Sequence, residues 1–271
     1  MSPTNEDQDT VSSRPFWTGT ISIGLVNIPV KLVTMVRTQS VSFRLLHKKD
    51  NHPIHYVRMC EHDNEVVPWE DVVKGYEVGK DEYVIFEKDE LEALKPESDR
   101  KIRLDKFVYS LSVDPAYFRK SYILLPDGNS DPYSLLLHAF QGSGRAGVGR
   151  ITLRTKEYPA LVREYRQALV LTTLHYPGEI VDPESIEELL GMPDPGEREV
   201  ELATRIIEDL SGDFDINEFH DSYRERVEEA VEKKLKGETV KIEQPKAEEV
   251  KDLMEALEET LGKMKADQAG R

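Results

Sequence analysis

The hydrophobic pattern changes period along the chain, and this change limits the possible folds more than any other sequence feature. From residue 16 onward, apolar residues alternate with small or polar ones, most clearly over residues 18–26, and a period of two is typical of a half-buried β-strand. After Pro177 the apolar spacing becomes three and four residues, as in residues 197–210, which is typical of an amphipathic helix. We therefore expect an α+β protein that is mainly β, with a β-rich body followed by helices.

Shorter segments complete the expected body. Alternation and turn residues predict strands at 30–36, 41–46, 55–59, 83–86, 102–110 and 122–125, and short helices at 66–75, 89–94 and 133–140. Residues 148–155 and 161–174 predict two long strands joined near residues 157–160. These exceed the usual length of ~5–6 residues, and we expect them to form a hairpin that projects from the body.

The chain divides into four expected parts. Residues 1–13 are acidic and are expected to be disordered. Residues 14–192 are the expected core, residues 196–237 a helical arm, and residues 238–271 a linker with a short C-terminal helix. That helix, expected over residues 247–264, has an apolar stripe. Two interpretations stay open: it packs within the protein or a dimer, or it docks a partner in a groove.

The net charge of −16 would argue against a nucleic-acid partner if the charge were spread evenly. It is not spread evenly, because residues 14–60 hold seven basic residues and one acidic residue. Residues 181–271 hold 27 acidic and 13 basic residues. The surplus of acid therefore belongs to the C-terminal third, and the body is free to carry a basic face.

Cysteine and histidine content limits the metal chemistry. The single cysteine, Cys60, excludes a disulfide framework and a multi-cysteine zinc module within one chain. His52, His55 and His62 lie near Cys60, but the C-x-H spacing is atypical of a closed zinc site, which needs four converging ligands. We expect a solvated turn here and no bound metal.

The sequence does not predict an enzyme. Residues 142–147 match G-x-G-x-x-G, but a dinucleotide site needs a strand, the glycines and then a helix, whereas the expected order here is helix, loop and strand. His138 and His175 have no Ser or Cys nucleophile in a recognisable motif. We expect no catalytic residue and no cofactor. An enzyme that uses the glycine loop is the alternative, and stabilisation by nucleotide would support it.

Basic residues accompany the expected strands in two series. Residues i and i+2 of a strand share a face, so Arg and Lys ladders can contact DNA phosphates without reading bases. A solvated sheet face explains the same pattern, and a binder of RNA or single strands is a further alternative that would need stacking aromatic residues. The candidate DNA contacts are Lys31, Arg37, Arg44, Lys48, Arg150, Arg154, Lys156, Arg163 and Arg166.

Several blocks of the sequence are similar to those of one known family. The most specific block is FWTGTISIGLVNIPVK at residues 16–31, which follows the pattern W-[ST]-G-x-[IL]-x-x-G-L-V-x-[IV]-P-V-x. Supporting blocks are RMCE, KGYE, SYIL, ITLR and LHYPGEI, which follow in order at residues 58–61, 74–77, 121–124, 151–154 and 174–180. Over residues 16–236 the chain resembles the bacterial Ku proteins, which hold broken DNA ends.

This resemblance implies a Ku-type β-barrel with an extended β-hairpin bridge and C-terminal helices. It implies a homodimeric ring that threads ends of linear double-stranded DNA without sequence specificity, and the hairpin of residues 148–174 is a sensible source of the dimer interface. It also implies a non-enzymatic scaffold that needs no cofactor and recruits an ATP-dependent multifunctional DNA ligase for non-homologous end joining. With no apolar run near the ~18 residues of a membrane span, we expect a soluble, cytoplasmic, nucleoid-associated protein without a membrane partner.

The chain differs from the family pattern at two places. Many relatives have C-x-x-C where this chain has Cys60 followed by Glu61, His62 and Asp63, which argues further against a metal. Many also end in a long Lys-rich tail, whereas only Lys263, Lys265 and Arg271 follow Leu261 here. DNA binding is therefore expected to depend on the body.

Overall fold

The computed structural model describes residues 14–94, 99–238, 254 and 256–262. The expected N-terminal tail of residues 1–13, and most of the linker and C-terminal helix of residues 238–271, lie outside the described residues. The chain forms two compact units, and each is described by itself. The first comprises residues 1–38 and 44–181, and the second comprises residues 39–43 and 182–271.

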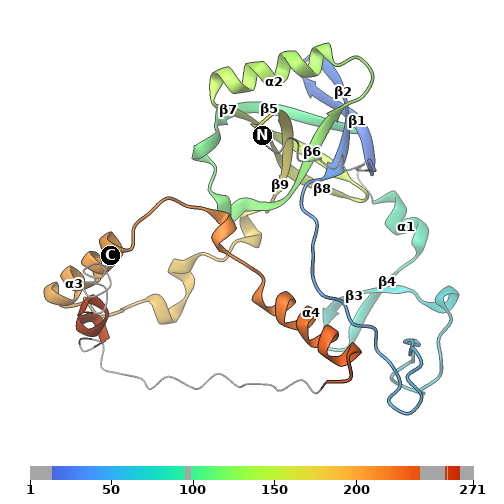
Figure 1. The fold of residues 1–271 in the computed structure, drawn as a ribbon. Helices are drawn as coiled ribbons and strands as arrows, with labels where there is room; N and C mark the ends of the chain where they lie inside the picture. Colours follow the sequence, from blue (N-terminus) through green and yellow to red (C-terminus); the bar gives the residue numbers. More distant parts are fainter. Residues whose placement is uncertain (1–13, 95–98, 239–253, 255, 263–271) are drawn as a thin grey trace, which may run out of the picture. The chain divides into compact units, whose positions relative to one another are not determined.

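Seven strands of the first unit close into a barrel with the order β1-β2-β6-β9-β8-β7-β5 (Figure 1). Neighbours pair antiparallel except β1 and β5, which close the barrel through a short parallel pairing. The barrel strands are β1 (Trp17–Ile23), β2 (Val26–Thr34), β5 (Lys101–Tyr109), β6 (Phe118–Pro126), β7 (Arg145–Leu153), β8 (Lys156–Tyr165) and β9 (Ala168–Leu174). The expected mainly β, barrel-containing α+β fold is confirmed.

Alternating side chains of these strands fill the interior. Ile28, Val30 and Leu32 of β2 point inward together, as expected for residues two apart on a strand. They join Leu124, Val162 and Leu171 in one apolar cluster. The alternation that the sequence showed over residues 18–26 therefore marks a hairpin, β1 turning into β2 at Gly24 and Leu25, rather than one strand.

Helix α2 (Asp131–Ser143) covers one end of the barrel and confirms the helix expected at residues 133–140 (Figure 1). Pro132 lies in its first turn, where a missing N–H costs nothing. Tyr133, Leu137 and Phe140 are buried in the barrel cluster. The Tyr133 hydroxyl donates to the Leu124 carbonyl at 2.7 Å and accepts from the Leu169 amide at 2.8 Å, so it ties the helix to β6 and β9.

The expected projecting hairpin of residues 148–174 is wrong. These residues form β7, β8 and β9, three neighbouring strands in the wall of the barrel. The turns lie at residues 154–155 and 166–167, and the expected turn at 157–160 is the middle of the β7–β8 pairing, where Tyr158 faces Ile151. The hairpin therefore does not project from the body.

Residues 44–86, called the exposed segment below, contain no buried residue. They hold the two-stranded sheet of β3 (Lys74–Gly79) and β4 (Glu82–Phe86), and helix α1 (Lys88–Ala93) follows. The expected strands at 41–46 and 55–59 do not form, because Leu46 and Met59 make only isolated bridges, to Pro53 and Val66. The expected helix at 66–75 is a single turn at Trp69–Asp71 followed by β3.

The second unit is helical. Helix α3 (Glu197–Asp209) begins where the Gly196 amide donates to the Glu199 carboxylate, and α4 (Ser222–Leu235) begins where Asp221 accepts from the Arg224 amide. Helix α3 confirms the helix that the three-four spacing predicts at residues 197–210, and both helices lie within the expected helical arm of residues 196–237. The described C-terminal residues are also helical.

Short 3-10 turns occur in both units, at Trp69–Asp71, Ser110–Ser112, Pro115–Tyr117, Pro177–Glu179, Pro183–Ser185, Glu187–Leu189 and Ile216–Glu218.

The C-terminal helix packs within the second unit. Leu261 is only 7% exposed, and Glu258 forms an ion pair with Arg198 of α3 at 2.9 Å. For the described part of this helix, these contacts favour the interpretation in which it packs inside the protein.

Among the described residues, we find no helix with the length and apolar character needed to cross a membrane.

Candidate nucleic-acid interface

The nine candidate DNA contacts do not form one cluster in the structure. Lys31 and Arg150 lie on the barrel wall, on β2 and β7. Arg154 and Lys156 lie at the β7–β8 turn, and Arg163 and Arg166 at the other end of β8. Arg37 follows β2, and Arg44 and Lys48 lie in the exposed segment. The arginines of β7, β8 and their turns therefore do not lie together, although the two strands are neighbours.

Three of the nine cations already have carboxylate partners. Lys31 Nζ lies 2.6 Å from Asp127 Oδ1. The Arg150 guanidinium lies 3.6 Å from Asp105 and 3.7 Å from Glu157. Lys156 Nζ lies 3.2 Å from Glu179 Oε1. A DNA phosphate that binds one of these three side chains has to compete with the carboxylate that is already paired with it.

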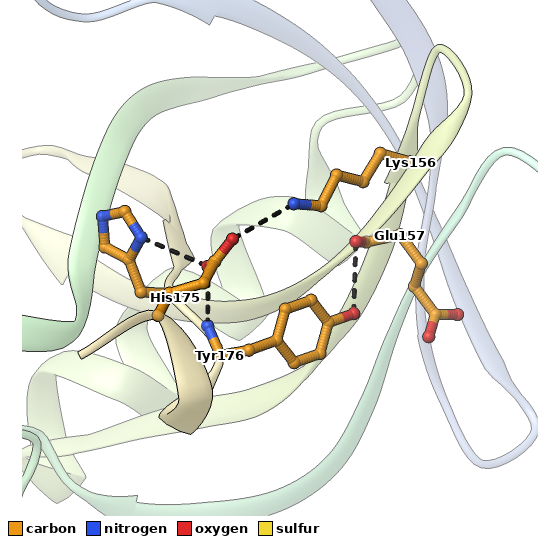
Figure 2. Close-up of polar contacts among 5 residues, drawn as sticks. Lys156, Glu157, His175 and Tyr176 are labelled. Atoms are coloured by element: carbon orange, nitrogen blue, oxygen red, sulfur yellow. Dashed lines mark hydrogen bonds and ion pairs between the residues drawn. The ribbon is translucent and has the colours of Figure 1, made fainter. Parts of the chain in front are cut away.

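Glu179 is the centre of a small polar network that joins the end of β9 to the β7–β8 hairpin. Its carboxylate accepts hydrogen bonds from the Tyr176 amide at 2.9 Å and from Lys156 at 3.2 Å, and it lies 3.3 Å from His175 Nδ1. The Tyr176 hydroxyl donates to the Glu157 carbonyl at 3.2 Å (Figure 2). The network therefore fixes the backbone that leaves the barrel.

The hydrogen bonds of this network act on the acidity of Glu179. The Tyr176 amide, followed by the Lys156 ammonium, stabilises the carboxylate and lowers the pKa of Glu179 from 4.5 to about 2. The carboxylate is thus charged at every physiological pH and is a permanent partner of Lys156.

At the other end of β8, two arginines share one aromatic ring. The guanidinium carbons of Arg163 and Arg166 lie 5.5 and 5.3 Å from the centre of the Tyr165 ring. Neither forms an ion pair with a described residue, and neither do Arg37, Arg44, Lys48 and Arg154. Six of the nine candidates therefore keep their charge uncompensated within the described residues.

The sequence analysis did not single out two further cations, Arg119 and Lys120 of β6. Arg119 lies over the Tyr158 ring at 4.7 Å, and Lys120 over the Tyr122 ring at 5.6 Å. A hydrogen bond to Tyr158 raises the pKa of Arg119 above its usual value. In the sequence, only the adjacent basic pair and the tyrosine two residues later could have indicated these contacts. The β-bulge that orients the two side chains has no sequence signature.

The expected solvated turn around Cys60 is present. Among the residues that the structure describes, no three His, Cys, Asp or Glu side chains are grouped to hold a metal ion. Cys60 is half-buried and its thiol is hydrogen bonded to Asp63. The backbone turns through hydrogen bonds between Cys60 and both Asn64 and Glu65.

The glycine motif of residues 142–147 has a structural role. Gly144 ends α2 in the left-handed conformation, with a φ of +60°, and β7 begins at the next residue. The order is helix, turn and strand, as the sequence predicts and opposite to that of a dinucleotide site. The strand expected to begin at residue 148 begins at Arg145, so the expected loop before it is shorter than predicted.

A comparison with protein families identifies the barrel. The family model described as "Ku70/Ku80 beta-barrel domain" matches residues 22–202, which include the end of β1, all of β2 to β9 with α2, and the beginning of α3. Together with the closed seven-stranded sheet, this match defines the class as a Ku-type β-barrel protein.

Full-length relatives agree with this class. A protein of Anaeromyxobacter sp. (strain K) is 39% identical over 92% of this chain and 85% of its own length. One of Heliobacterium modesticaldum is 37% identical over 94% of both chains, and one of Bacillus subtilis is 32% identical over 95% of this chain and 85% of its own. Each is named "Non-homologous end joining protein Ku". The chain belongs to the Ku family, as the resemblance of residues 16–236 indicated.

Proposed function

We propose that this protein binds the ends of double-stranded DNA, without sequence specificity, in double-strand break repair by non-homologous end joining. The observation that carries this proposal is the similarity, along nearly the whole chain, to proteins named for that process. In this proposal the protein is a non-enzymatic, nucleoid-associated scaffold that uses no cofactor.

The proposed DNA contacts are phosphate contacts. A protein that holds any DNA end needs cations that meet the backbone rather than side chains that read base edges. Arg37, Arg44, Lys48, Arg154, Arg163 and Arg166 suit this role best, since they have no ion pair with a described residue. Lys31, Arg150 and Lys156 are weaker candidates because a nearby carboxylate neutralises each one.

The acidic total does not oppose this proposal. Most of the surplus acid lies in residues 181–271, and the Debye length at physiological salt is about 8 Å. Charges that are farther from bound DNA than this length are largely screened, so the local cations control affinity.

The proposal includes a homodimer whose two copies surround the DNA. The exposed segment supports this part, because it holds many large apolar side chains and buries none of them. Tyr56, Trp69 and Tyr76 are 85%, 71% and 68% exposed. Exposed apolar surface on this scale is typical of a protein interface, and aromatic residues dominate such interfaces energetically. A two-fold dimer needs one self-complementary surface, and the exposed segment replaces residues 148–174 as its proposed source.

Recruitment of an ATP-dependent multifunctional DNA ligase completes the proposal. The C-terminal helix is a weaker candidate for the ligase contact than its apolar stripe suggests, because Leu261 is buried and Glu258 is paired with Arg198. The rest of the second unit, including exposed Phe214 and Phe219, is the better place to search by substitution.

A gel-shift competition tests end binding. Labelled linear duplex is bound at moderate salt and challenged with unlabelled linear duplex or with the same sequence as a covalently closed circle. We expect the linear competitor to displace the label at much lower concentration, because a closed circle offers no end. Equal competition by the two forms would reject threading, and preference for one linear sequence over others would indicate base readout.

A further inference from the structure

One end of the barrel carries two cations, Arg119 and Lys120, that are not among the nine candidate DNA contacts. Tyr133 fastens α2 to Leu124 and Leu169, near the end of β6 and the start of β9. The start of β6, the end of β9 and the β7–β8 turn therefore lie at the opposite end of the barrel. We call this end the barrel mouth and define it by Arg119, Lys120, Tyr122, Lys156, Tyr158 and Tyr176.

A β-bulge turns two adjacent cations toward the mouth. Phe118 pairs with Leu174 and Lys120 pairs with Thr173, so Arg119 is an extra residue without a partner on β9. A bulge bends its strand and redirects side chains. Lys120 then shares a face with Tyr122, two residues on, while Arg119 reaches Tyr158 across the mouth.

Aromatic rings hold these cations in place. Tyr122 is buried, and Tyr158 packs against the barrel cluster, so neither ring is free to move away. Arg119 and Lys156 approach the Tyr158 ring from 4.7 and 5.3 Å, and Lys156 is also 6.0 Å from the Tyr176 ring. A cation–π contact does not use the N–H donors of Lys120, and Arg119 keeps for a ligand the donors that it does not give to Tyr158. Fixing the side chains in advance also reduces the entropy lost on binding.

The mouth has an excess of positive charge. Lys156 is paired with Glu179, but neither Arg119 nor Lys120 forms an ion pair with any residue in the described part of the chain. Burial raises the pKa of Tyr122, and the positive charges of Arg119 and Arg154 act on it in the opposite direction, which places Arg154 in the same field. Arg119 and Lys120 thus lie on aromatic rings without an ion pair of their own, and Arg154 adds a third positive charge, while the charge of Glu179 acts on Arg119 as well as on Lys156.

We propose that the barrel mouth is an additional phosphate-binding site, with Arg119 and Lys120 as its principal contacts, for the phosphodiester backbone of DNA. Arg presents a planar fork of donors to phosphate, and Lys adds a compact charge. The proposal rests on the proposed function for the identity of the polyanion. It adds to that function two contacts from β6, Arg119 and Lys120, which lie outside the two basic series of the sequence.

The test removes both cations and measures DNA binding as a function of salt. The full-length R119Q/K120Q double variant is compared with wild type by fluorescence anisotropy, using a blunt duplex and the same duplex with a single-stranded overhang. Each lost phosphate contact lowers the magnitude of the log–log salt slope by about 0.9, so a decrease of about 2 is expected, with several-fold weaker binding. The matched control K233Q/K234Q removes the same charge from α4 and is expected to leave the slope unchanged.

The two DNA substrates separate the possible sources of the phosphate. Equal loss on both substrates places the mouth along the duplex, and loss confined to the overhang places it along the single strand. A double variant that keeps the wild-type affinity and slope on both substrates overturns the proposal. If wild type itself shows no preference for ends in the gel shift, the proposed function fails independently of this comparison.

A conservative variant guards against loss of fold. R119K/K120R keeps both charges and is expected to retain the wild-type salt slope. If it loses the slope as the glutamine variant does, while both melt at lower temperature than wild type, the two residues act in packing and the phosphate site is rejected.

Discussion

Gly149 lies where β5 and β7 approach so closely that no side chain fits. A Cβ atom at this position would be 1.7 Å from the Arg103 carbonyl oxygen and 2.9 Å from the Leu104 Cα. Both are backbone atoms, so the strand itself would have to shift. The approach occurs beside the β-bulge of β5 between Leu104 and Lys106, which brings the two backbones out of regular register.

Replacement of Gly149 by alanine is therefore expected to destabilise the barrel by about 1–3 kcal/mol, the usual range for overpacking. The matched control is Gly142→Ala in α2, where an added Cβ meets nothing within 4 Å and a helical alanine is favourable. Urea unfolding measures both variants. Equal stability of the two would contradict the close backbone approach.

At the scale of the element, the Glu179 network joins the end of β9 to the β7–β8 hairpin, and its stability has a defined pH dependence. The folded-state pKa of about 2 lies below the ordinary value of 4.5. The carboxylate therefore contributes stability that is complete above the ordinary pKa and is lost as the pH falls through the folded pKa.

We expect Glu179→Gln to lower the melting temperature at neutral pH. The difference from wild type should narrow as the pH falls below 4.5 and approaches 2. Melting curves of both proteins, recorded from neutral pH downward, measure this difference in melting temperature. The control is Glu61→Gln, whose carboxylate makes no hydrogen bond or ion pair with another described residue, and it should melt with wild type throughout. A constant difference between Glu179→Gln and wild type would mean that the carboxylate charge is not the cause.

The elements also show what the sequence could and could not predict. Helices α2, α3 and α4 were predictable because their apolar spacing and turn residues agree. The barrel turns at residues 154–155 and 166–167 were not, because Arg154 and Arg166 adopt positive φ without glycine, proline or asparagine to signal it. Pro159 suggested a turn instead, yet it pairs with Arg150 within the sheet.

From the sequence, the candidate site could be predicted only as a set of cationic residues and not as an arrangement in space. The sequence indicates which residues are cationic, but not that Asp127 neutralises Lys31 or that Glu179, 23 positions away, holds Lys156. These pairings depend on strand register and on the path of the chain after β9. The strands expected at 41–46 and 55–59 failed for a related reason: the exposed segment has no second layer on which alternating apolar residues could be buried.

At the scale of the whole molecule, the proposed function makes DNA binding depend on a dimer formed through the exposed segment. We expect the W69D/Y76D double variant to be monomeric and to lose end binding, because charges at two aromatic positions oppose burial in an interface. Sedimentation measures the mass, and the gel shift measures binding. The control N51D adds a charge in the same segment at a position whose φ of +57° aspartate tolerates, and it should remain dimeric.

Sedimentation and the gel shift together test the proposed dimer. A double variant that still sediments as a dimer would move the interface elsewhere. A wild type that is monomeric at all concentrations would reject the ring. The two aromatic residues are exposed within the chain, so a loss of barrel stability is not expected, and a melting curve checks this.

The closed barrel limits where a β-strand of another molecule can pair with this protein. Each barrel strand has two neighbours, so the barrel has no edge strand, although β1 and β5 pair over only three residues. In the β3–β4 sheet each strand has one neighbour, so among the described strands only these two are open along a whole edge. Aggregation by strand addition would therefore begin at β3 or β4, inside the segment proposed for specific pairing.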